Sequence, residues 1–92
     1  MSNRTEAAPA QLRAARGLLG WSQADLARAS GVSLRTVKTL ESAPDFAPLA
    51  GRPRTVEALI GALREAGVTL TSGGGRIGAE RSLRGEDSSL VR

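Results

Sequence analysis

The chain has 92 residues, enough for one compact domain with a single small core. It contains no cysteine, histidine or tyrosine. These absences exclude disulfides and thiolate metal sites, and they remove the most common general base and metal ligand. We therefore expect a protein that is not an enzyme and that has no catalytic residues, no metal site and no cofactor. No apolar run reaches the length of a membrane span, and Met1 to Pro9 lack the apolar segment of a signal peptide, so we expect a cytoplasmic protein with no membrane partner.

The net charge of +4 is concentrated in the first half of the chain. Residues 1–42 carry six basic groups against three acidic ones, whereas residues 43–72 carry three of each. Residues 73–92 carry four basic groups against three acidic ones. A polyanion such as nucleic acid would be attracted to the surplus in the first half.

A first helix is expected to begin near Pro9, because proline suits the first turn of a helix. Leu12, Ala15 and Leu19 then recur at the spacing of one helical face. Gly20 is expected to end this helix.

Two short helices with start and stop signals follow. Ser22 is a suitable N-cap with Asp25 three residues later, as in a capping box, and Gly31 is expected to end the helix. Ser33 caps a second helix only two residues after that glycine. Apolar residues stand at the staple positions around both caps, in the pairs Trp21–Leu26 and Val32–Val37. Two capped helices joined by a glycine turn predict a helix-turn-helix, and we call residues 22–41 the reading head.

The second half of the chain predicts a loop, one more helix and a short extended segment. Residues 42–53 contain three prolines and form a loop whose path the sequence does not predict. A helix is expected from about Thr55 to Ala66, with an apolar face of Val56, Leu59, Ile60 and Leu63. Val68 to Thr71 alternates as a strand does, and Gly73–Gly75 lacks the lysine of a phosphate-binding loop, so we interpret it as a turn.

The fold class expected from these elements is all-α. A compact domain of four or five helices would span residues 8–78, with a short C-terminal β-hairpin left open as an addition. Residues 1–7 and 79–92 are polar and are expected to be disordered.

The spacing of residues 12–41 resembles the Cro/repressor-type (XRE-like) helix-turn-helix family of phage and bacterial regulators. The residues that match are Ser22-Gln23, Leu26-Ala27, Gly31-Val32-Ser33, Val37 and Leu40-Glu41. The segment AGVTLTSGGGRIG resembles the end of one subgroup, so the resemblance covers roughly residues 8–78. The family commonly has a glycine after the glutamate that ends the second helix, whereas Ser42 stands here.

The resemblance implies a lambda-repressor-like domain that binds double-stranded DNA sequence-specifically and regulates transcription, with repression favoured over activation. One recognition helix covers only a few base pairs, which favours a homodimer on an inverted-repeat operator. The last helix and residues 68–77 are the candidate dimer surfaces. The same fold also serves as a protein-interaction module, such as an antitoxin or adaptor, and this is the alternative function. No pocket for a small-molecule effector is evident from the sequence.

The site residues follow from the resemblance together with the free face of the second helix. Arg35 is the best candidate for a bidentate guanine contact, and Leu34 would meet a thymine methyl. The candidate base contacts are Leu34, Arg35 and Thr39. The candidate phosphate contacts are Gln23, Ser33, Thr36 and Lys38.

Each of these interpretations has a purely structural alternative. Ser22-Gln23 would then only cap a helix, and Arg35 and Lys38 would be an ordinary solvated surface. An exposed Leu34 needs no function. Trp21 is interpreted as an anchor of the core and not as a platform for base stacking.

Overall fold

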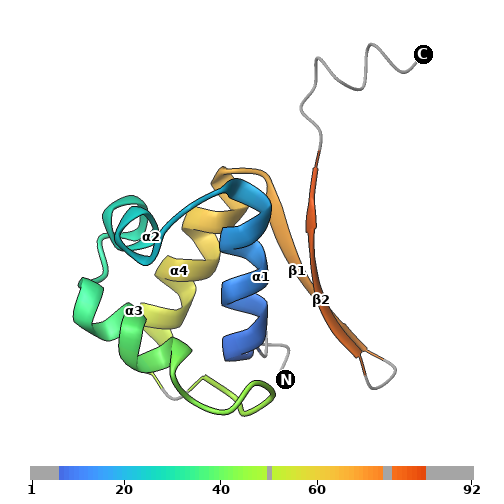
Figure 1. Ribbon diagram of the computed structural model, residues 1–92, viewed down its shortest axis with the longest axis horizontal. Helices are drawn as coiled ribbons and strands as arrows, with labels where there is room; N and C mark the ends of the chain where they lie inside the picture. The colour runs from blue at the N-terminus through green and yellow to red at the C-terminus, as the bar shows by residue number, and fades with distance from the viewer. Residues whose placement is uncertain (1–6, 50, 74–75, 83–92) are drawn as a thin grey trace.

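The computed structural model describes residues 7–49, 51–73 and 76–82, and they form four helices followed by a β-hairpin (Figure 1). In chain order the elements are α1 (Pro9–Leu19), α2 (Gln23–Ser30), α3 (Leu34–Glu41), α4 (Pro53–Glu65), β1 (Val68–Gly73) and β2 (Arg76–Arg81). The helical domain is confirmed, but the all-α class is wrong because β1 and β2 pair as an antiparallel sheet. The hairpin left open by the sequence is therefore present.

The core is a single cluster of aliphatic side chains contributed by all four helices and β1. Its buried members are Leu12, Ala15, Leu26, Val37, Leu40, Leu59, Leu63 and Val68. Trp21 lies half-buried against this cluster. On α4, Leu59 and Leu63 are buried, whereas Val56 and Ile60 are only half-buried. The helix begins two residues earlier than expected, because Pro53 occupies its first turn.

The hairpin packs against α1, and one buried side chain joins the two. Gln11 is 2 % exposed, and its Nε2 donates to the carbonyl oxygens of Thr71 at 2.7 Å and Gly78 at 2.9 Å. Its Oε1 accepts from the Ala8 backbone N–H at 2.9 Å, so the same amide also closes the first turn of α1. Gln11 thus fixes both strands of the hairpin to the start of α1.

The described structure extends beyond the expected domain limits of 8–78. Strand β2 continues to Arg81, and the Ser82 backbone N–H donates to the Gly67 carbonyl at 2.6 Å. Residues 79–82 are therefore part of the fold, because Ala79 packs against the core and the strand ladder continues past it. Ala7 is also buried. The rest of the segments expected to be disordered, residues 1–6 and 83–92, lies outside the described residues.

The loop after α3 is tied to the beginning of α1. The Ala10 N–H donates to the Asp45 carbonyl at 3.1 Å, and the Leu49 N–H donates to the Ala7 carbonyl at 3.1 Å. Arg13 adds a hydrogen bond to the Glu41 carbonyl at 2.7 Å and an ion pair with Asp45. The loop is therefore held to the start of α1 at Asp45 and Leu49, although it contains prolines. Among the described helices, none is both long and apolar enough to cross a membrane.

Candidate nucleic-acid interface

The reading head has the two caps and the glycine turn that the sequence predicts. Ser22 Oγ accepts from the Asp25 N–H at 3.0 Å while Asp25 Oδ2 accepts from the Ser22 N–H at 2.9 Å, which completes the capping box of α2. Gly31 ends α2 in the left-handed conformation, with φ of 78°. Ser33 Oγ caps α3 by accepting from the Thr36 N–H at 3.1 Å. This geometry turns the chain sharply between the two helices.

Helix α3 has one buried and one exposed face. Val37 and Leu40 are buried against α2 and the core, together with Glu41. The exposed side chains are Ser33, Leu34, Arg35, Lys38 and Thr39. All three candidate base contacts therefore lie on the face that is free to meet a ligand. Thr36 is half-buried, and its Oγ1 accepts from the Ser33 hydroxyl at 2.9 Å.

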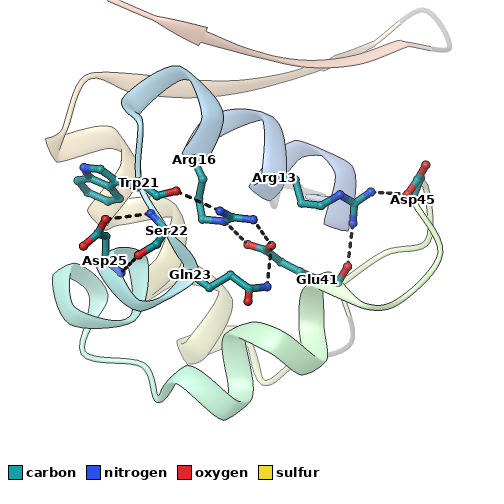
Figure 2. A network of polar contacts seen from close by, with 8 residues as sticks. All are labelled: Arg13, Arg16, Trp21, Ser22, Gln23, Asp25, Glu41 and Asp45. Carbon is teal, nitrogen blue, oxygen red and sulfur yellow. Dashed lines mark hydrogen bonds and ion pairs between the residues drawn. The ribbon is translucent and has the colours of Figure 1, made fainter.

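The candidate phosphate contact Gln23 takes part in a buried polar network behind that face (Figure 2). Glu41 accepts two hydrogen bonds from Arg16, at 2.9 Å from Nε and 2.7 Å from Nη2. Gln23 Nε2 donates to the same carboxylate at 3.2 Å. Arg16 Nη1 donates to the Trp21 carbonyl at 3.0 Å. One network thus connects α1, the start of α2 and the end of α3.

The central ion pair of this network, between Arg16 and Glu41, is largely shielded from water. The Glu41 side chain is 2 % exposed and the Arg16 side chain 17 %. Hydrogen bonding to Glu41 raises the pKa of Arg16 further above its ordinary value, against the opposing effect of burial. Neither Arg16 nor Glu41 was predicted as a site residue from the sequence. The available signal was the spacing of Val37, Leu40 and Glu41, which puts a glutamate on the buried face of α3, where it requires a cationic partner.

Two further exposed basic residues stand at the start of α4, and neither was singled out from the sequence. Arg52 and Arg54 are exposed at the start of α4. The preceding Gly51 lies against α3, since a Cβ built on it would lie 3.4 Å from Leu40 Cδ2. Within the described residues, neither of these arginines forms an ion pair, and neither does Arg35 or Lys38. Arg35 and Lys38 on α3, and Arg52 and Arg54 at the start of α4, are thus exposed basic residues without an ion-pair partner in the described part of the chain.

The capping box makes the stability of α2 depend on pH. Hydrogen bonds from the Ser22 N–H and hydroxyl, with attraction from Arg28, hold the pKa of Asp25 below its ordinary 3.8. A carboxyl whose pKa is lowered by folding stabilises the protein above its unfolded pKa and loses that effect as the pH falls through the folded pKa. We expect the excess stability of the wild type over Asp25→Asn to be constant near neutral pH and to shrink below about pH 4. Urea denaturation of both chains at a series of pH values measures this; a difference that stays constant down to about pH 2 would contradict it.

The first three helices of the chain resemble a known protein family. Residues 12–48, from the first turn of α1 into the loop after α3, match the family described as Helix-turn-helix. This part of the chain is therefore similar to a helix-turn-helix family, in agreement with the resemblance that its sequence carries. No curated protein and no solved structure matches the chain.

Proposed function

We propose that the protein is a cytoplasmic transcriptional regulator that places α3 in the major groove of double-stranded DNA. The observation that carries the proposal is the exposed face of α3, on which Arg35 and Lys38 have no ion-pair partner within the described residues. A helix fits the major groove of B-DNA, and arginine can contact guanine through two hydrogen bonds. The buried face of the same helix is held by Val37, Leu40 and Glu41, so the exposed face is presented on a fixed frame.

Side chains on this surface divide into those that read bases and those that bind the backbone. Arg35, Leu34 and Thr39 would contact base edges from the exposed face of α3. Ser33, Thr36 and Lys38 would contact phosphates at its start and flank. Gln23 would use its second amide hydrogen for a phosphate, since Glu41 already accepts one and fixes the orientation of the amide. Arg52 and Arg54 would extend the phosphate contacts beyond the end of α3.

The proposed regulator acts as a homodimer and as a repressor. A single α3 reads too few base pairs for selectivity across a genome. Two copies on an inverted repeat, with half-sites about 34 Å apart, would double the contacted sequence. Repression is the role that the resemblance favours, and it would follow from occupation of such an operator.

Salt dependence of DNA binding tests the proposal directly. We expect the full chain to bind a mixed-sequence duplex with an association constant that falls steeply as the salt concentration is raised. Basic side chains that neutralise phosphates release the cations condensed on the DNA, and this release becomes less favourable at higher salt. Fluorescence anisotropy of a labelled duplex between about 50 and 200 mM salt measures the slope. Absence of any salt-sensitive binding to duplex DNA would contradict the proposed function.

A further inference from the structure

We infer that Arg13 of α1 is a positioning residue for α3: it holds the end of that helix in a fixed place, so that the exposed face of α3 is aimed at the base edges. The inference rests on the proposed DNA binding, and it adds to the determinants of specificity a residue that does not touch DNA. It is carried by the way in which α3 ends, by the two partners of the Arg13 guanidinium, and by the face of α1 from which Arg13 extends.

Helix α3 ends without the glycine that follows each of the two helices before it. Gly20 follows α1 and Gly31 follows α2, both in the left-handed conformation, with φ of 69° and 78°. The residue after α3 is Ser42, which is right-handed, with φ of −85° and ψ of −7°. A left-handed residue at this place turns the chain so that the next N–H groups bond to the last carbonyls of the helix. Without that turn, the carbonyl of Glu41 is left to accept from another part of the fold.

Arg13 supplies the missing donor from α1. Its Nη1 donates to the Glu41 carbonyl oxygen at 2.7 Å, and its Nη2 forms an ion pair with Asp45 in the following loop. A positive charge beside the last carbonyls of a helix also interacts favourably with the helix dipole. The guanidinium is planar and rigid, so its N–H donors stand at fixed angles to one another. One side chain of α1 therefore fixes both the last residue of α3 and the loop that follows it.

Arg13 binds the main chain of α3, whereas Arg16 binds a side chain of the same helix. Figure 2 shows both arginines extending from α1 to Glu41. Arg16 donates to the carboxylate of Glu41, and Arg13 donates to its carbonyl oxygen. Residues three apart lie on the same face of a helix, so the two contacts hold the end of α3 against one face of α1. Loss of Arg13 would leave the carboxylate bound and would allow the helix end to turn about it.

A displacement of this end affects the exposed face because α3 is short. Its eight residues span about 12 Å, so a tilt of about 5° about its start would move its end by about 1 Å. A binding side chain has to stay within about 0.5 Å of its productive position. Thr39, one of the proposed base contacts, lies near this end of the helix. The charge of Arg13 is already paired with Asp45, so we expect its removal to change the position of α3 and not the number of phosphate contacts.

Hydrogen exchange of the full chain without DNA tests whether Arg13 holds the helix end. We expect Arg13→Met to speed exchange of the Glu41 and Ser42 amides by about tenfold, because the last turn opens locally once its anchor is lost. Exchange of the Leu26 amide in α2 should change much less. Arg64→Met is the matched control, because it removes the same charge from an exposed position on α4, and it should leave all three amides unchanged. Equal acceleration in α2 and α3, or no acceleration, would overturn the inference.

The specificity of DNA binding tests the consequence for base reading. An operator is selected from a random duplex pool with the wild-type chain, and affinities for it and for a mixed-sequence duplex are measured at several salt concentrations. We expect Arg13→Met to lower the ratio of the two affinities by about tenfold, a loss of the size of one base contact. The slope of log K against log salt should stay at the wild-type value, as in Arg64→Met.

Two results of the DNA measurement would overturn the inference. One is a ratio of affinities equal to that of the wild type. The other is equal weakening on both duplexes with a slope reduced by about one, which would make Arg13 a phosphate contact. A wild-type chain that bound no duplex would contradict the proposed function and, with it, the role in base reading. The exchange measurement distinguishes that result from a failure of Arg13 to hold α3, because it needs no DNA.

Discussion

Glu41→Ala is expected to lower the free energy of unfolding by about 3 to 5 kcal/mol, because it leaves the Arg16 guanidinium enclosed without its anion. The effect should lie near the lower value, since the Arg16 side chain retains 17 % exposure and water can reach part of it. Arg16 would lose two hydrogen bonds and Gln23 would lose one. A folded domain is typically stable by about 5 to 15 kcal/mol, so a loss of about 3 kcal/mol would remove between about a fifth and three fifths of the stability.

Urea denaturation followed by the fluorescence of the single tryptophan, Trp21, measures this loss. Glu41→Gln is the matched control, because its amide oxygen still accepts hydrogen bonds from Arg16 while the negative charge is gone. The double variant Arg16→Met with Glu41→Leu should recover much of the stability, since an apolar pair of similar volume is often neutral or better in a buried position. A loss below about 1 kcal/mol in Glu41→Ala would show that the network is no more than a surface ion pair.

Arg35→Ala is expected to abolish preference at one position of the operator while binding to unrelated duplexes changes little. A bidentate contact with guanine contributes about 1 to 3 kcal/mol of discrimination, which corresponds to about 5- to 150-fold between the preferred base and another. The operator is first selected from a random duplex pool with the wild-type chain. Affinities of both chains are then measured for that operator and for its single-base variants. A selected sequence that is the same for Arg35→Ala and wild type would contradict the role of Arg35 in reading bases.

Lys38→Ala provides the contrast within the same helix. Loss of a phosphate contact should weaken binding to all duplexes by a similar factor and reduce the slope of log K against log salt by about one. Arg64→Ala removes the same charge from an exposed position near the other end of α4, about 15 to 18 Å along the helix axis from the arginines at its start. This control should leave DNA binding close to that of the wild type. If Lys38→Ala and Arg64→Ala weakened DNA binding equally, the net charge of the chain alone would account for the binding.

The helix boundaries were predictable wherever a local signal fixes the backbone. Serine caps and left-handed glycines act over three or four residues, so the beginnings of α2 and α3 and the end of α2 follow from neighbouring sequence. Helix α3 ends at Glu41 as expected, although Ser42 replaces the glycine that the family commonly has there. The hairpin was predictable only in outline, because alternation and a glycine turn do not define how far a strand extends along its partner.

Features that depend on distant parts of the chain were not predictable. The hydrogen bonds of Gln11 with Thr71 and Gly78 join residues 60 and 67 positions apart, and no local pattern indicates them. The path of the loop after α3 depends on backbone contacts with the start of α1. Gln23 was interpreted as a phosphate contact, or as part of a helix cap, whereas its amide bonds to Glu41. The base contacts themselves remain predictions, since they depend on a ligand that the sequence does not describe.

The core contains side chains from all four helices and from β1, so a shorter fragment of the protein lacks part of it. The segment with the family match ends at residue 48, but Leu59, Leu63 and Val68 complete the cluster around Leu12 and Leu26. A peptide of residues 12–48 would expose the apolar sides of its own helices, and chains below about 40 residues without disulfides or metals seldom compensate for such exposure. It would also lack Gln11 and the strands to which that residue bonds. Residues 12–48 alone would therefore be a mostly unfolded peptide, because the core also requires side chains of α4 and β1.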